Sequence, residues 1–160
     1  MIRRAEPSDA VAIAAIYNEY IAHSVITFDT EPVSIGAMQT QISELSAHYP
    51  YFVYELDGQV VGYCYAHPWK RHAAYGHTYE TTVYLAPGYG GRGFGRMLME
   101  ALIEACRQTG CHALIACITA DNTASFALHE RLGFRAVSHF EQVGYKFGRW
   151  LDIVDYELVL

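Results

Sequence analysis

The chain has 160 residues, of which 52% are hydrophobic and 18% charged, a composition typical of a globular domain with a buried core. Its net charge is −6 at pH 7 and its Lys and Arg residues form no run, so it lacks the basic surface that non-specific nucleic-acid binding requires. The N-terminus is charged where a signal peptide needs an apolar run, and no apolar stretch reaches transmembrane length. We therefore expect one domain over residues 1–160, located in the cytoplasm, with no nucleic-acid or membrane partner.

The cysteine and histidine residues show no metal-binding or disulfide pattern. The four cysteines contain no C-x-x-C pair and lie in apolar segments, which is typical of buried, reduced thiols. His67, His72 and His77 are five residues apart, a spacing that matches neither one face of a helix nor one face of a strand. We therefore expect no metal site.

The N-terminal half begins with a short strand and two predicted helices. Ser8 and Asp9 are typical helix-start residues after a strand at residues 2–5, and the apolar spacing continues to about residue 21. An irregular segment, residues 24–32, then precedes a second helix at about residues 34–48, which Pro50 ends.

Three strands are predicted next, at residues 51–56, 59–66 and 78–85. Asp57-Gly58 is a strong hairpin-turn pair between the first two strands, and residues 67–76 form a loop before the third. The C-terminal half then alternates helices and strands: a helix that follows a glycine-rich loop and ends near residue 110, a strand at 113–118, a helix at 122–132, and strands at 134–140 and 150–158. Hairpins followed by a β-α-β crossover predict an α/β fold of the α+β type, with a mixed, mostly antiparallel sheet and helices on both faces.

The glycine-rich loop reads Gly88-Tyr-Gly-Gly-Arg-Gly-Phe-Gly95 and opens the third helix. Glycines allow backbone N–H groups to converge on an anion, and the helix N-terminus adds a positive dipole. A Walker A loop is excluded because Arg96 and Met97 stand where Lys and Ser or Thr are needed. The loop also contains G-x-G-x-x-G, but the dinucleotide fingerprint belongs in the first β-α turn of a parallel sheet. The pyrophosphate of coenzyme A is the third candidate ligand.

Two segments resemble the acetyl-CoA motif of the GNAT acetyltransferases: residues 83–96, which contain Val83-Tyr84-Leu85 and Gly91-Arg92-Gly93-Phe94-Gly95-Arg96, and residues 122–134. Four further segments resemble the phosphinothricin and methionine sulfone/sulfoximine N-acetyltransferases, at residues 28–32, 66–70, 79–84 and 143–152. The resemblance therefore extends over nearly the whole chain and implies the GNAT fold and acetyl-CoA as cofactor. Gly90 departs from the family, which usually has Gln or Arg at that position, so only the backbone is expected to contribute there.

The resemblance also implies roles for individual residues. It places the catalytic base at Glu80, whose apolar strand context could raise its pKa; the alternative is a solvent-facing strand residue. His129 stands where many GNAT members have the Tyr that protonates the thiolate; alternatively it only packs behind Leu128 and Leu132. The residues expected to bind the cofactor are Val83, Tyr84, Leu85, Gly90, Gly91, Arg92, Gly93, Phe94, Gly95, Arg96, Asn122 and Ser125.

An aromatic and cationic set is expected to bind the acceptor: Phe28, Trp69, Lys70, Arg71 and Tyr75. The alternative is that residues 69–75 form a solvated loop. The methionine sulfoximine branch commonly has Arg after the position of Tyr75, where this chain has Gly76.

The expected function is acetyl transfer from acetyl-CoA to the amine of a small amino-acid-like acceptor of the phosphinothricin or methionine sulfone/sulfoximine type. Two alternatives are a peptide or protein N-terminal acetyltransferase and a non-catalytic acyl-CoA-binding module. The apolar C-terminal strand and the resemblance also suggest a homodimer, with Lys146 or Trp150 near the partner's pocket.

Overall fold

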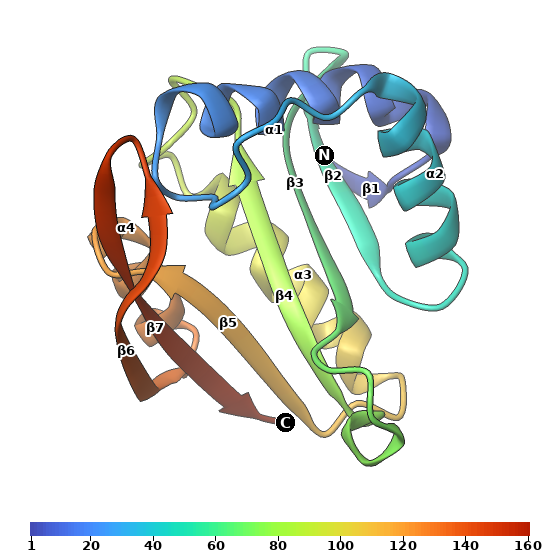
Figure 1. Ribbon diagram of the computed structural model, residues 1–160. Coiled ribbons are helices and arrows are strands. Elements are labelled where there is room, and N and C mark those ends of the chain that lie inside the picture. The colour runs from blue at the N-terminus through green and yellow to red at the C-terminus, as the bar shows by residue number, and fades with distance from the viewer.

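The computed structural model describes residues 1–160, which form one seven-stranded sheet in the order β1-β2-β3-β4-β5-β7-β6 (Figure 1). All neighbouring strands are antiparallel except β4 and β5, which are parallel. The strands are β1 Ile2–Arg4, β2 Tyr51–Leu56, β3 Gln59–Pro68, β4 Thr78–Leu85, β5 Ala113–Thr119, β6 Arg135–Lys146 and β7 Arg149–Val159. The helices are α1 Ala10–His23, α2 Ile35–Ser46, α3 Phe94–Arg107 and α4 Thr123–Arg131, with short 3-10 turns η1 Pro7–Asp9 and η2 Ala73–Tyr75. This mixed, mostly antiparallel sheet confirms the predicted fold class.

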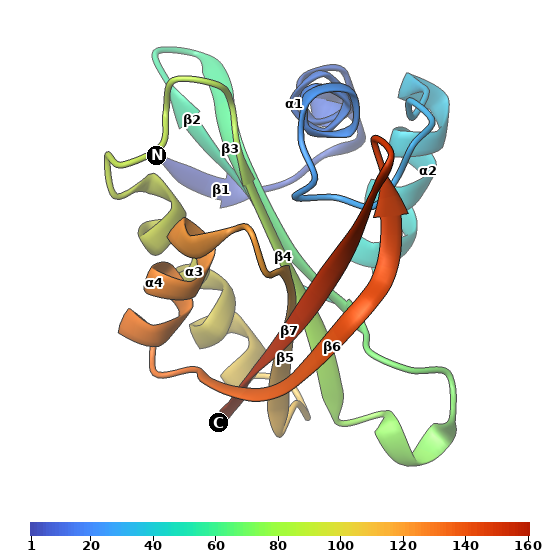
Figure 2. The same cartoon turned by 60° about the vertical axis from the view of Figure 1, so that its left-hand side comes forward.

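Helices cover both faces of the sheet, α1 and α2 on one side and α3 and α4 on the other (Figure 2). Each pair has its own apolar core. On the first side, Ile13 of α1 and Ile42 of α2 are fully buried against β2 and β3. On the other side, Leu98 and Leu102 are fully buried against the opposite face, one helical turn apart as an amphipathic helix requires. None of the helices is long and apolar enough to span a membrane.

Several helix and turn boundaries lie where turn and capping residues in the sequence predicted them. Asp57 and Gly58 both adopt positive φ (50° and 77°), the conformation that a tight β2–β3 hairpin turn requires. The Ser34 hydroxyl accepts a hydrogen bond from the Ala37 amide at the start of α2. The Asn122 side chain caps α4 in the same way, accepting from the Ser125 amide at 3.2 Å.

The C-terminal hairpin differs from the prediction, because β6 continues to Lys146 instead of ending near residue 140. Its register against β7 shifts twice, between Ala136 and Ser138 and between Phe140 and Gly144, and Gln142 has a φ of 54°. Bulges of this kind break the apolar-polar alternation from which a strand is recognised, so the sequence signal ended before the strand did. The predicted helix end near residue 110 was also late, since α3 ends at Arg107.

The strands β4 and β5 diverge along their length. They pair only from Thr78 to Glu80 on β4 and from Ala113 to Ile115 on β5. Beyond that point β4 stays paired with β3 to Leu85, while β5 stays paired with β7 to Thr119. One edge of residues 81–85 therefore has no strand partner, and Figure 1 shows the two strands separating like the arms of a V.

Candidate active site

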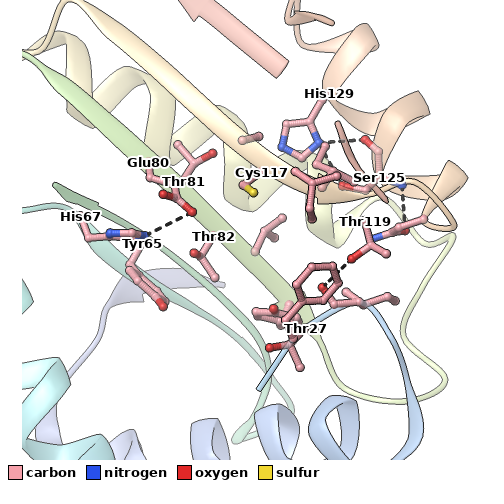
Figure 3. Close-up of a pocket in the computed structure, with 18 of the residues that line it drawn as sticks. Thr27, Tyr65, His67, Glu80, Thr81, Thr82, Cys117, Thr119, Ser125 and His129 are labelled. Atoms are coloured by element: carbon pink, nitrogen blue, oxygen red, sulfur yellow. Dashed lines mark hydrogen bonds and ion pairs between the residues drawn. The ribbon is translucent and has the colours of Figure 1, made fainter. Parts of the chain in front are cut away.

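A cavity of about 310 Å³ lies at the divergence of β4 and β5, and Figure 3 shows its lining side chains. Its walls come from α1, from the segment before α2, from β3, β4, β5 and β7, and from α4 with the residue that caps it. Of the residues singled out from the sequence, seven line it: Phe28, Glu80, Val83, Tyr84, Asn122, Ser125 and His129. Segments far apart in the sequence thus meet because the sheet opens here.

Glu80 is the last residue of β4 that pairs with β5, and the cavity begins there. Burial raises the pKa of its carboxyl to about 7, and the negative charge of Asp155 adds a smaller rise. No hydrogen bond is donated to the carboxylate within the chain; its ion-pair partner is His67, whose Nε2 lies 3.9 Å from Oε1. A carboxyl group with a pKa near neutrality and free oxygens can accept a proton at physiological pH.

His129 points into the same cavity from α4 and is 3% exposed. Its Nδ1 lies 2.8 Å from the Ser125 carbonyl oxygen, which assigns the hydrogen to Nδ1 and leaves a lone pair on Nε2. Burial lowers the pKa of the imidazole, while the hydrogen bond to Ser125 opposes this more weakly. The neutral ring in this tautomer accepts a hydrogen bond at Nε2. It can donate one there only after it has been protonated.

The glycine loop has the geometry of an anion cradle. Gly88, Gly91 and Gly93 have φ values of 83°, 73° and 83°, in the left-handed region that favours glycine. A Cβ added at Gly90, Gly91 or Gly93 would meet no atom within 4 Å, so the space beside this backbone is open.

The amides of residues 90–96 also have no hydrogen-bond acceptor within the chain, and they lead into the N-terminus of α3. Unpaired N–H groups at a helix N-terminus are the donors that a pyrophosphate requires. Arg92 lies over the rings of Tyr89 and Phe94, with its guanidinium carbon 5.3 and 4.9 Å from their centroids. The residues present therefore fit the pyrophosphate of coenzyme A.

The segment between this cradle and Glu80 is the free edge of β4. Val83 and Tyr84 line the cavity, whereas Leu85 does not. The Leu85 carbonyl instead accepts a hydrogen bond from the Tyr20 hydroxyl at 2.7 Å. An extended ligand can add to an unpaired strand edge as another strand would, which suits the amide-containing arm of coenzyme A.

Phe28 lines the cavity, and β6 packs closely against its ring. A Cβ at Gly144 would overlap the Phe28 ring, so glycine is required for this close approach. Lys146 is 3% exposed, and its Nζ donates a hydrogen bond to the Thr27 carbonyl at 2.8 Å. Burial lowers the pKa of this ammonium. Lys146 is therefore engaged within its own chain, while Trp150 is exposed on the outside of the hairpin.

The other residues expected to bind the acceptor lie outside the cavity, in the loop that connects β3 to β4. The rings of Trp69 and Tyr75 pack edge to face with centroids 5.2 Å apart, and the Lys70 Nζ lies 4.4 Å from the Trp69 ring. Arg71 is exposed and forms no ion pair. These four residues thus pack on one another or face solvent, and their role in binding remains a prediction.

Several cavity residues were not anticipated from the sequence, among them Tyr17, Thr27, Tyr65, His67, Cys117 and Thr119. Cys117 corrects the expectation that all four thiols are buried: all are free, but only Cys64 and Cys106 are buried, and Cys117 is exposed. It faces the cavity because β5 has left β4 at this point. Although the residue is exposed to the cavity, the protein atoms around its thiol partly exclude water, and this desolvation raises the thiol pKa to about 12, with smaller contributions from the Asp155 and Glu80 charges, so the thiol stays neutral. No three His, Cys, Asp or Glu side chains converge as a metal site would require.

Residues 13–134 match the acetyltransferase (GNAT) family. The chain is 37% identical over 160 residues to an L-amino acid N-acyltransferase of Escherichia coli, which covers 99% of this chain and 93% of the relative. It is 36% identical over 160 residues to an L-methionine sulfoximine/L-methionine sulfone acetyltransferase of Salmonella typhimurium, which covers 99% and 94%. A phosphinothricin acetyltransferase of Sinorhizobium meliloti, solved in complex with acetyl-CoA, superimposes with a TM-score of 0.96 at 33% identity and covers 100% of this chain and 88% of that one. The chain therefore belongs to the GNAT acetyltransferase family, and the predicted resemblance is confirmed.

Proposed function

We propose that this protein transfers the acetyl group of acetyl-CoA to the primary amine of a small amino-acid-like acceptor of the phosphinothricin or methionine sulfone/sulfoximine type. One observation carries this proposal: a carboxyl that accepts no hydrogen bond within the chain, with a pKa raised to about 7, lies in a cavity beside a strand edge that leads to an open anion cradle. The names of the relatives support the acceptor class.

At the cofactor end, the unpaired amides of residues 90–96 would bind the pyrophosphate, and the free edge of β4 would pair with the amide-containing arm. Asn122 and Ser125 would contact the same arm where they line the cavity. Acetyl-CoA supplies the activated acetyl group as a thioester. The chain has only to hold it with its carbonyl carbon facing Glu80.

At the acceptor end, Glu80 would take one proton from the ammonium group, because a protonated amine has no lone pair with which to attack. The new C–N bond forms as the C–S bond breaks. The nitrogen then loses a second proton, and the departing sulfur takes up a proton to leave as a thiol. His129, neutral and with its lone pair on Nε2, would accept a hydrogen bond from the resulting thiol.

A cavity wall that is fixed in place supports a small acceptor over a peptide. Phe28 and Thr27 line the cavity, and both are held by β6 through Gly144 and Lys146. A protein or peptide N-terminal acetyltransferase needs an open groove for the residues that follow the amine.

A two-part experiment tests the proposal. Calorimetric titration with acetyl-CoA measures binding, and a thiol-release assay measures turnover with phosphinothricin, methionine sulfone, methionine sulfoximine, other amino acids and short peptides. We expect turnover with the small amino-acid-like amines. Binding without turnover on any amine would indicate a non-catalytic acyl-CoA-binding module, and preferred turnover of peptides would indicate the N-terminal acetyltransferase.

We further propose that the protein is a cytoplasmic homodimer. Large apolar side chains stand exposed on the β6–β7 hairpin: Val137, Phe140, Val143, Tyr145, Phe147 and Trp150. A patch of this kind usually marks an interaction surface, and two-fold pairing is the commonest way to bury one. Sedimentation as a monomer at micromolar concentration would contradict the dimer.

A further inference from the structure

His67 lies directly across the β3–β4 ladder from Glu80, inside the cavity. Its Nε2 is 3.9 Å from Glu80 Oε1, and both side chains are 28% exposed (Figure 3). Cross-strand neighbours on one face of a sheet are held side by side by the ladder itself, so this proximity is built into the fold.

The hydrogen-bond partner of Nδ1 determines which tautomer the His67 ring adopts. Nδ1 lies 3.0 Å from the Pro68 carbonyl oxygen, which can only accept, so Nδ1 carries the hydrogen. The lone pair of Nε2 therefore faces the Glu80 carboxyl. When Glu80 is ionised, two acceptors face one another with no hydrogen between them. When Glu80 has taken up a proton, its O–H faces a lone pair. The separation of 3.9 Å is about 1 Å longer than a hydrogen bond, so the transfer requires the two side chains to move closer together.

The proton balance of the reaction leaves Glu80 with a proton to release. A protonated amine and a thioester yield an amide and a thiol, and one proton is left over in each turnover. If Glu80 receives that proton, it must lose the proton before the next ammonium group can react.

We propose that His67 relays this proton: Nε2 takes it from the Glu80 carboxyl to give an imidazolium, which then releases it to solvent from the same nitrogen. This inference rests on the proposed function, since it assumes that Glu80 is the base. Both side chains are 28% exposed, so the His67 imidazolium can release the proton from Nε2 to solvent at the cavity.

The other ionisable groups around Glu80 leave His67 as the available acceptor. The Asp155 carboxylate on β7 already accepts a hydrogen bond from the Ser138 hydroxyl at 3.0 Å, and its charge raises the pKa of Glu80. Burial raises the pKa values of the Cys117 thiol on β5 and of the Tyr65 phenol on β3, so both remain protonated and have no capacity for a further proton. Burial lowers the pKa of His67 below its usual range, so the imidazolium takes the proton from Glu80 against a small gradient, holds it only briefly and donates it readily to water.

The test compares His67→Gln and His67→Ala with wild type, at low and high buffer concentration. We expect kcat to fall about tenfold in dilute buffer, less than the ~10²–10⁴-fold loss expected when the base itself is removed. Acetyl-CoA affinity should stay within twofold of wild type. Added imidazole should restore kcat in His67→Ala, because a free base can then collect the proton from Glu80. His77→Gln is the matched control: its Nδ1 also pairs with a backbone carbonyl, that of Gly110, but away from the cavity.

The double variant Glu80→Gln/His67→Gln completes the test. A relay predicts that the double variant is as active as Glu80→Gln alone, since His67 has no proton to accept there. Wild-type kcat in both His67 variants at every buffer concentration would overturn the relay. The relay would also be overturned if imidazole failed to restore kcat in His67→Ala and if the loss of kcat in the double variant equalled the product of the two single losses. Wild-type protein that acetylates no amine would instead overturn the proposed function, and the relay with it.

Discussion

The two ends of the opening between β4 and β5 are built in different ways. The cofactor end is made of consecutive backbone: the amides of residues 90–96 and the free edge of β4. The acceptor end is made of side chains from distant segments, with Phe28 from the segment before α2, His67 from β3 and Glu80 from β4. A site made of backbone depends on conformation and tolerates many side chains, whereas a site made of converging side chains depends on each of them. Substitutions at the two ends should therefore separate cofactor binding from turnover.

The largest effect should come from Glu80→Gln at the acceptor end. The substitution keeps the shape of the side chain and removes the proton acceptor, so kcat should fall by about 10²–10⁴-fold at neutral pH. Acetyl-CoA affinity, measured by calorimetric titration, should be unchanged because Glu80 lies away from the cradle. An equal loss of affinity and turnover would mean that the two ends are not separable in this way.

Gly93→Val should have the opposite effect, at the cofactor end. Gly93 has a φ of 83°, and its missing Cβ would project into the open cradle. We expect acetyl-CoA affinity to fall by at least about tenfold, because the valine side chain would occupy the space through which the pyrophosphate approaches these amides.

Gly58→Val is the matched control for Gly93→Val. It imposes the same left-handed strain at a φ of 77° in the β2–β3 turn, also in open space but away from the cavity. It should lower thermal stability and leave acetyl-CoA affinity intact. Unchanged affinity in a folded Gly93→Val variant would contradict the assignment of the cradle.

Gly144→Ala should disturb only the acceptor wall. Its added Cβ would overlap the Phe28 ring and push it toward the cavity. We expect KM for the acceptor to rise by about threefold to tenfold, equivalent to ~1 kcal/mol, with acetyl-CoA affinity unchanged. Gly36→Ala in α2, where a Cβ meets nothing, is the control and should leave both constants unaltered. A Gly144→Ala variant with normal KM would show that Phe28 does not contact the acceptor.

The last effect is on stability and not on binding or turnover. The pKa of Glu80 in the folded chain, about 7, lies above the ordinary carboxyl value of 4.5, so the folded chain binds this proton more tightly than the unfolded chain does. Stability from this group is therefore present below pH 4.5 and lost as pH rises to about 7, by at most about 3 kcal/mol. Glu80→Gln should gain thermal stability relative to wild type between pH 5 and pH 8, while Glu44→Gln, an exposed site on α2, should not. A loss of stability in Glu80→Gln at pH 8 would indicate a structural role.

The two ends also differ in how far the sequence predicted them. The glycine loop and the Asp57-Gly58 turn were recognisable because each is a short, contiguous signal with one backbone conformation to satisfy. His67 was weighed only as a possible metal ligand, since its relation to Glu80 exists in the register of β3 against β4 and not in the spacing along the chain. The cavity itself arises because β4 and β5 stop pairing after three residues, and no local pattern reports where two strands diverge. The contact between β6 and Phe28 could not be predicted for a related reason. The bulges in β6 interrupt the alternation of apolar and polar residues, so the strand was not predicted to reach Lys146.

The most direct test of the central claim, that Glu80 is the base, is the pH dependence of kcat/KM for the acceptor in wild type and Glu80→Gln, from about pH 6 to 9.5. Wild-type activity should rise through a limb near pH 7, the pKa of Glu80. Glu80→Gln should lack this limb and rise only toward the pKa of the amine, so that the gap between the two proteins narrows at high pH. Parallel profiles of nearly equal height would contradict the assignment of Glu80 as the base.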